Sequence, residues 1–226
     1  MDLVAQFESD GFVKLPFLAS QSLLTEFTQT ANLTQTAKSP GKRHLTGLKE
    51  PIADLLNDSK LKPILEKIIG GSFRPVRTIF FKKDLTANWF VPWHQDLTVA
   101  LKRKRSHPEF TKWTIKNNVP HAEAPMSLLS KMVTLRLFLD PANQDNGAMW
   151  VAPKSHKLGK LKQDKITSLE KKEVCFEGEK GALYLFSPLL LHRSEKSKTD
   201  VQRRALQIEI APKNSLFQPL EWYENI

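Results

Sequence analysis

The stretch GALYLFSPLLLHRSEKSKTDVQRRALQIEIAP (residues 181–212) contains two strand-like runs on either side of a polar connection. The second run alternates polar and apolar residues from position 203 onward, which is typical of a β-strand with one buried face. No regular alternation of strands with helices surrounds this stretch, although a parallel doubly wound sheet would require one. The stretch therefore favours a mainly β fold.

Three further runs upstream have strand-like composition, and two segments before residue 73 have helical spacing. Many strands after a helical N-terminal part are typical of a barrel or of a double-sheet jelly roll. We expect a single domain over residues 1–226, with a helical part over about 1–72 and a strand-rich core over about 73–212. A segment over about 103–130, rich in Pro and His, is either a structured insert or an active-site lid. The strand-like runs are FRPVRTIFFKK (73–83), KMVTLRLFLD (131–140) and GAMWVAP (147–153), and the helical segments are SQSLLTEFTQTANL (20–33) and KLKPILEKIIGG (60–71).

The composition excludes several classes of protein. The chain has 226 residues, 40% of them hydrophobic, which is enough for a sizeable core, and no apolar run is long enough to cross a membrane. The single cysteine, Cys175, cannot form an intramolecular disulfide or anchor a Cys-type zinc site. The N-terminus has no signal-peptide pattern, so we expect a cytoplasmic protein with no membrane partner.

The net charge of +10 allows three interpretations: a soluble surface, a nucleic-acid partner or an anionic small-molecule substrate. The basic residues are scattered, apart from one dense run at residues 102–105. Scattered lysine most often serves solubility, so a nucleic-acid partner is not expected. An anionic substrate remains an alternative.

A candidate metal motif occurs in VPWHQDLTVA (residues 91–100), where His94 and Asp96 stand two residues apart. In a strand this spacing aims both side chains at the same face. A lone pair of this kind is common by chance, and its simplest interpretation is a surface pair near a turn. A third ligand changes that: two histidines and one carboxylate on one face of an octahedral ion suit non-haem Fe(II) oxygen chemistry. His192, which follows an apolar strand, is the best candidate.

Two arginines are candidate cations of the same pocket. Alternation puts Arg203 on the polar face of the last strand and Arg204 on its apolar face, which we expect to pack under the helices. If the last two strands pair as a hairpin, Arg203 returns to the metal, where its planar fork suits the distal carboxylate of 2-oxoglutarate. Arg136 is on the inner face of its strand by the same rule. For both arginines the alternative is an exposed strand charge.

Several short motifs together resemble the phytanoyl-CoA dioxygenase family of Fe(II)/2-oxoglutarate oxygenases. The resemblance implies a double-stranded β-helix, that is, a cupin-like jelly roll with flanking helices. It also implies that His94, Asp96 and His192 are the iron ligands, and that Arg203 binds 2-oxoglutarate with Ser194 and Lys83 nearby. Asp96 is present, so the halogenating variant of this chemistry is not expected. The motifs, in the family's order, are DGFVKLPF, PWHQD, DNGAMWVAPKSHK, GALYLFSPLLLHRS and RRALQIEIAP.

The function expected from the resemblance is that of a dioxygenase that uses Fe(II), 2-oxoglutarate and O2. It would hydroxylate an unidentified small molecule and release succinate and CO2. Trp93, His121 and Arg136 are candidates for the substrate pocket. The alternatives are a nucleic-acid oxidative demethylase of the same iron class and a non-catalytic jelly-roll binding protein; the sequence indicates no oligomeric state.

Overall fold

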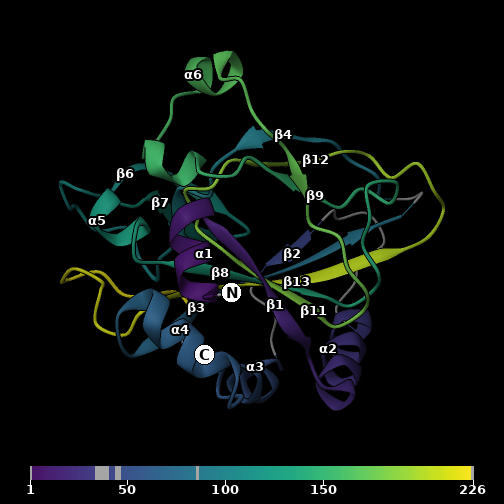
Figure 1. Cartoon of the computed structure of the whole chain (residues 1–226). Coiled ribbons are helices and arrows are strands. Elements are labelled where there is room, and N and C mark those ends of the chain that lie inside the picture. Colours follow the sequence, from purple (N-terminus) through teal and green to yellow (C-terminus); the bar gives the residue numbers. More distant parts are fainter. Residues whose placement is uncertain (1, 34–40, 44–46, 85–86, 225–226) are drawn as a thin grey trace.

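A computed structural model describes residues 2–33, 41–43, 47–84 and 87–224 of the chain (Figure 1). Its largest element is a six-stranded sheet in which every neighbouring pair of strands is antiparallel. The strands run in the order β1 (Phe12–Leu18), β11 (Ala182–Phe186), β8 (Val133–Phe138), β13 (Arg203–Pro212), β3 (Phe73–Lys83) and β2 (Gly41–Arg43).

Two smaller antiparallel sheets complete the β structure. The four-stranded sheet lies opposite the face of the large sheet that the helices do not cover (Figure 1). This is the two-layer arrangement of a cupin-like jelly roll, so the predicted fold class is confirmed. The four-stranded sheet is ordered β10 (Val174–Cys175), β9 (Met149–Val151), β12 (His192–Ser194) and β4 (Val91–His94), and the three-stranded sheet β5 (Thr98–Ala100), β7 (Val119–Glu123) and β6 (Thr111–Lys116).

Four helices cover the outer face of the large sheet (Figure 1). The apolar positions of β13 and β8 alternate toward these helices, and they join Phe27 and Leu65 in one buried cluster. Burial of each such side chain contributes roughly 1.5–3 kcal/mol, so this face anchors the domain. The helices are α1 (Leu3–Asp10), α2 (Gln21–Leu33), α3 (Lys49–Leu56) and α4 (Leu61–Ile69); two short ones, α5 (Met126–Leu129) and α6 (Gln163–Ser168), and a 3-10 turn, Ser155–Leu158, lie elsewhere.

Two strand predictions hold at both ends, whereas the run at 181–192 forms a strand only over Ala182–Phe186, with β12 beginning at His192. The run at 73–83 coincides with β3, and the alternating run at 203–212 coincides with β13. Helix α4 ends where the sequence predicted, because Gly70 adopts a left-handed conformation with φ of 82° that glycine tolerates without strain. No helix among the described residues is long and apolar enough to cross a membrane.

Two expectations about organisation need correction, and one pair of alternatives is decided. The N-terminal part is not purely helical, since β1 pairs with β11 and β2 pairs with β3. The segment 103–130 is structured: it forms the β6–β7 hairpin, pairs with β5 and ends in α5. Strands β12 and β13 do not form a hairpin. The polar connection between them crosses from the four-stranded sheet to the large one, and β13 pairs instead with β3 and β8.

Candidate active site

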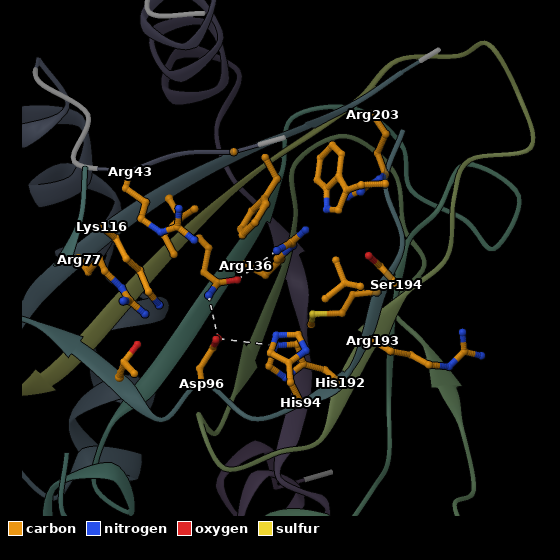
Figure 2. A pocket seen from close by; sticks show the side chains of 18 of the residues that line it. Arg43, Arg77, His94, Asp96, Lys116, Arg136, His192, Arg193, Ser194 and Arg203 are labelled. Carbon is orange, nitrogen blue, oxygen red and sulfur yellow. Dashed lines mark hydrogen bonds and ion pairs between the residues drawn. The ribbon is translucent and has the colours of Figure 1, made fainter. Parts of the chain in front are cut away.

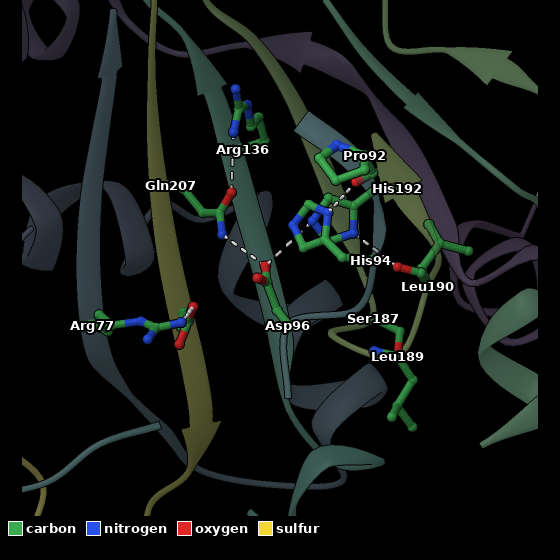
Figure 3. A network of polar contacts seen from close by, with 11 residues as sticks. Arg77, Pro92, His94, Asp96, Arg136, Ser187, Leu189, Leu190, His192 and Gln207 are labelled. Atoms are coloured by element: carbon green, nitrogen blue, oxygen red, sulfur yellow. Dashed lines mark hydrogen bonds and ion pairs between the residues drawn. The ribbon is translucent and has the colours of Figure 1, made fainter. Parts of the chain in front are cut away.

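His94, Asp96 and His192 meet on the inner face of the four-stranded sheet. His94 ends β4 and His192 begins β12, and the two are direct cross-strand partners with ring centroids 4.2 Å apart. Asp96 follows β4, where its backbone N–H donates to the Pro188 carbonyl at 2.9 Å. One ligand atom from each of the three side chains lies within 4.8 Å of the other two (Figure 3). The three side chains therefore offer two nitrogens and one oxygen to a single ion.

The orientation of both imidazole rings suits a metal. The Nδ1 atom of His94 lies 2.9 Å from the Pro92 carbonyl, and that of His192 lies 2.9 Å from the Leu190 carbonyl. An Nδ1–H that donates to a carbonyl leaves the Nε2 lone pair free for a metal. Burial, and then the nearby His94, lowers the pKa of His192 to about 4, so this ring is neutral near pH 7.

Asp96 is ionised although it is half-buried. Burial opposes the charged form, but the two histidines, Arg77 and a hydrogen bond from Gln207 outweigh it and lower the pKa of the Asp96 carboxyl. Gln207 Nε2 donates to Asp96 Oδ2 at 3.2 Å, and Gln207 Oε1 accepts from Arg136 Nη1 at 3.1 Å (Figure 3). Because Arg136 can only donate, the amide of Gln207 is fixed with its NH2 toward Asp96.

Arg136 completes this chain of contacts and lines the cavity, as its position on the inner face predicted. Its guanidinium carbon lies 4.6 Å from the centroid of the Phe81 ring. Burial, and then the neighbouring Arg203, lowers the pKa of Arg136 to about 9. Sequence reasoning placed Gln207 on the correct face but gave it no role; its position directly opposite Arg136 on the neighbouring strand was the missing information.

Arg203 and Ser194 line one end of the cavity (Figure 2). Lys83 does not line the cavity, but it lies beside both residues. Arg203 is 2% exposed and is the cross-strand partner of Lys83. The Lys83 ammonium lies 3.2 Å from Ser194 Oγ, and burial, followed by the charges of Arg203 and Arg136, lowers the pKa of Lys83 to about 7. Arg203 Nε donates to the Asn146 carbonyl at 3.3 Å, and no described carboxylate lies within ion-pair distance of its guanidinium.

Arg204 points to the opposite face, as the alternation predicted. Its Nε and Nη2 atoms each lie 2.7 Å from an oxygen of Asp140, a bidentate ion pair, and its Nη1 donates to Asn32 at 3.0 Å. The two adjacent arginines therefore differ in partner: Arg204 has a carboxylate, whereas Arg203 faces the cavity.

The other end of the cavity holds a second group of cations that the sequence did not reveal. Arg43, Arg77 and Lys116 lie on the far side of Asp96 from Arg203 (Figure 2). Arg77 lies six residues before Lys83 on β3 and shares its face, so periodicity could have found it. No local signal marks Arg43 or Lys116, because their positions depend on how β2 and the β6–β7 hairpin dock. The whole cavity has a volume of about 340 Å³.

Two of the predicted pocket residues do not line the cavity. Trp93 precedes His94 in a strand and therefore points to the other face, where its ring lies 5.3 Å from the Arg193 guanidinium carbon and 5.7 Å from the Lys171 ammonium. His121 is fully buried in β7, with Nδ1 2.9 Å from the Val119 carbonyl. Neither residue therefore reaches the cavity that the metal ligands line.

A cupin-like jelly roll with two histidines and one carboxylate on one inner face defines a class of protein, the non-haem iron oxygenases. The profile described as "Phytanoyl-CoA dioxygenase (PhyH)" matches residues 7–205. The chain belongs to this family of iron- and 2-oxoglutarate-dependent oxygenases, as its motifs predicted, and it is an enzyme. Its cofactor and co-substrates are accordingly iron, 2-oxoglutarate and O2.

Solved structures share the fold at low sequence identity. AviO1 from Streptomyces viridochromogenes Tue57 is 17% identical with a TM-score of 0.65, and the match covers 96% of each chain. EctD from S. alaskensis is 18% identical with a TM-score of 0.71, over 96% of this chain and 78% of that one. The carbocyclase SnoK from nogalamycin biosynthesis is 12% identical with a TM-score of 0.66, over 93% of this chain and 83% of that one. No curated protein sequence matches the chain.

Proposed function

We propose that the protein hydroxylates a small molecule, using iron bound by His94, Asp96 and His192 and 2-oxoglutarate held by Arg203. The observation that carries the proposal is the convergence of three ligand atoms within 4.8 Å beside a buried arginine that has no carboxylate partner among the described residues. When bound, iron and 2-oxoglutarate with O2 supply the oxidation of a C–H bond, with release of succinate and CO2.

The donor set fits Fe(II). The Nδ1 atom of each histidine faces a backbone carbonyl and leaves Nε2 for the metal, and Asp96 is an ionised carboxylate that Gln207 orients. With three protein ligands on one face, a bound Fe(II) would have positions left for the co-substrate and O2. EctD has been solved with bound Fe and with 2-oxoglutarate and 5-hydroxyectoine, which supports the same cofactors here.

At the co-substrate end, the distal carboxylate of 2-oxoglutarate would accept hydrogen bonds from Arg203. Lys83 and Ser194 would supply one further cation and a hydroxyl, since both lie next to each other at this end. The buried position of Arg203 excludes water from that contact and makes the charged hydrogen bonds stronger than they would be in solvent.

Hydroxylation is the simplest outcome of such a site, although related folds direct the same cofactors elsewhere: SnoK is a carbocyclase and SnoN an epimerase. The decisive experiment screens a fractionated metabolite extract for compounds that stimulate succinate formation in the presence of Fe(II), 2-oxoglutarate and O2. Mass spectrometry of the stimulating compound should show the gain of one oxygen atom. A product without added oxygen would still be consistent with an iron- and 2-oxoglutarate-dependent enzyme, but it would reject hydroxylation as the reaction.

The metal assignment predicts the behaviour of three variants. His94→Ala, Asp96→Ala and His192→Ala should each abolish succinate formation and weaken Fe(II) binding, while circular dichroism shows a folded protein. Arg204→Ala is the matched control, because its side chain faces away from the cavity. Near-normal Fe(II) affinity and turnover in any of the three would remove that residue from the metal site.

A nucleic-acid demethylase is the competing function of the same iron class. The net charge of +10 suggests it, and the only dense basic run in the sequence is at residues 102–105. None of these residues lines the cavity, and Lys102 forms an exposed ion pair with Glu221 at 2.9 Å. Replacement of the whole run by glutamine should leave Fe(II) and 2-oxoglutarate binding unchanged. DNA binding with a steep salt dependence that the replacement removes would favour the demethylase.

A further inference from the structure

The cavity holds more positive charge than the proposed chemistry uses. Six arginine or lysine residues line it, whereas Asp96 is the one carboxylate among the described lining residues. Arg203 is assigned to 2-oxoglutarate, and two other cations have acidic partners: Arg77 with Glu209, and Arg193 with Glu173 and Glu195. The cations that remain are Arg43, Lys116 and Arg136.

Arg43 stands in the same row of the sheet as the residue that orients the metal ligand. It is the cross-strand partner of Ile79 on β3, and Ile79 is in turn the partner of Gln207 on β13. Two inter-strand steps of roughly 4.8 Å separate Arg43 from Gln207, so their backbones are on the order of 10 Å apart. An arginine side chain reaching inward from the edge strand therefore ends near the metal side of the cavity, as Figure 2 shows.

Lys116 arrives at the same place from a separate part of the chain. It is the last residue of β6, directly before Asn117 and Asn118, whose φ values of 51° and 61° form the tight turn of the β6–β7 hairpin. Lys116 and Asn117 both line the cavity, so the tip of the hairpin forms part of its wall. Lys116 and Arg43 lie side by side in Figure 2, with Arg77 beneath them.

The two cations repel each other, and the described residues offer neither of them an acidic partner. Burial and then Arg77 lower the pKa of Arg43, and burial, Arg77 and Arg43 lower that of Lys116. The nearby Glu209 does not neutralise them, because it already forms an ion pair with Arg77 on the neighbouring strand. Within the described part of the chain, no carboxylate lies within ion-pair distance of Arg43 or Lys116. Half-buried cations held together in this way are arranged for an anion from outside the protein.

We propose that Arg43 and Lys116 form an anion subsite that binds a carboxylate or phosphate group of the substrate, on the side of Asp96 away from Arg203. The proposal rests on the proposed function and narrows it to substrates that carry a negative charge. The cavity volume of about 340 Å³ must also hold the co-substrate, so the substrate is a small anionic molecule or the anionic end of a larger one.

The test titrates two probe anions, inorganic phosphate and acetate, into protein loaded anaerobically with Mn(II) and saturating 2-oxoglutarate, with calorimetry as the readout. The test variant is Arg43→Gln with Lys116→Gln. The matched control is Lys42→Gln with Lys112→Gln, which removes the same charge from the same two strands, because Lys42 and Lys112 are exposed and line no part of the cavity.

We expect saturable binding of at least one anion to the wild type and the control, and at least tenfold weaker binding to the test variant, which corresponds to about 1.4 kcal/mol. The tighter of the two anions then identifies the group that the substrate carries. Equal binding by the test variant, equal loss in the control, or no saturable binding by the wild type would overturn the subsite.

The same titrations separate this proposal from the one on which it rests. Binding of Mn(II) and 2-oxoglutarate is measured first, and its absence in the wild type would reject the proposed function, whereas loss of anion binding alone concerns only Arg43 and Lys116. If the double variant unfolds, the single Lys116→Gln variant decides, because Lys116 lies at a hairpin tip outside the main core; unchanged anion affinity there would reject its role.

Discussion

Replacement of Arg203 and of Arg204 by alanine distinguishes two arginines that are adjacent in sequence but face opposite sides of β13. Arg203 is 2% exposed, lines the cavity and donates one hydrogen bond, at 3.3 Å, to the Asn146 carbonyl. Arg204 forms a bidentate pair with Asp140 on the other face. Only Arg203→Ala should therefore affect 2-oxoglutarate.

The size of the effect follows from burial. Loss of one partner of a buried, hydrogen-bonded charge pair costs roughly 2–5 kcal/mol, because the other charge is left unpaired. At about 1.4 kcal/mol per tenfold change, Arg203→Ala should weaken 2-oxoglutarate binding by roughly 30-fold or more. Arg204→Ala should leave the affinity within about threefold, and it should lower the free energy of unfolding by roughly 1 kcal/mol through loss of the partly exposed pair.

The assay is an anaerobic titration of 2-oxoglutarate into each Fe(II)-loaded variant, followed by the absorption band that the bound co-substrate produces. Thermal unfolding of both variants provides the control for stability. The reasoning would be refuted by the reverse order of affinities, since that would require a register shift in β13 that exchanges the faces of Arg203 and Arg204.

Two further predictions concern the residues around the metal and the co-substrate. Gln207→Leu removes the hydrogen bond to Asp96 and should weaken Fe(II) binding by roughly 10- to 100-fold while the melting temperature shows a folded protein; unchanged affinity would deny Gln207 an orienting role. Lys83, with a pKa of about 7, is largely neutral in the free enzyme above that pH, whereas bound 2-oxoglutarate favours the ammonium form. Because the complex then holds more protons than the free enzyme, 2-oxoglutarate affinity should fall as pH rises from 7 to 9, and Lys83→Met should abolish this dependence; a pH profile shared by both proteins would contradict the assignment.

The sequence predicted which face of a strand each residue occupies more reliably than which strand lies beside it. The alternating pattern correctly predicted that Arg203 and Arg204 face opposite sides and that Arg136 faces the cavity. The same rule, applied to Trp93, would have excluded that residue from the pocket, because it precedes His94 by one position. The expected hairpin between the last two strands was wrong because a local pattern cannot show that the connection crosses between sheets.

Arg43 and Lys116 were beyond prediction for the same physical reason. Their place in the cavity depends on the pairing of β2 with β3 and on the docking of a hairpin, and both are long-range contacts without a local sequence pattern. Gln207 represents an intermediate case. Its face followed from alternation, but its role required the registry that sets it opposite Arg136.

The registry of β13 couples the metal to the co-substrate. Gln207 and Arg203 are four residues apart on one face, roughly 13 Å along the strand. A slip of one residue would turn Gln207 away from Asp96 and Arg203 out of the cavity at the same time. Metal binding and co-substrate binding would therefore be lost together. Arg43 and Lys116 belong instead to an edge strand and a hairpin tip. Those elements can change without moving the residues of β13, so selection of the substrate can be altered in this fold while the iron chemistry is kept.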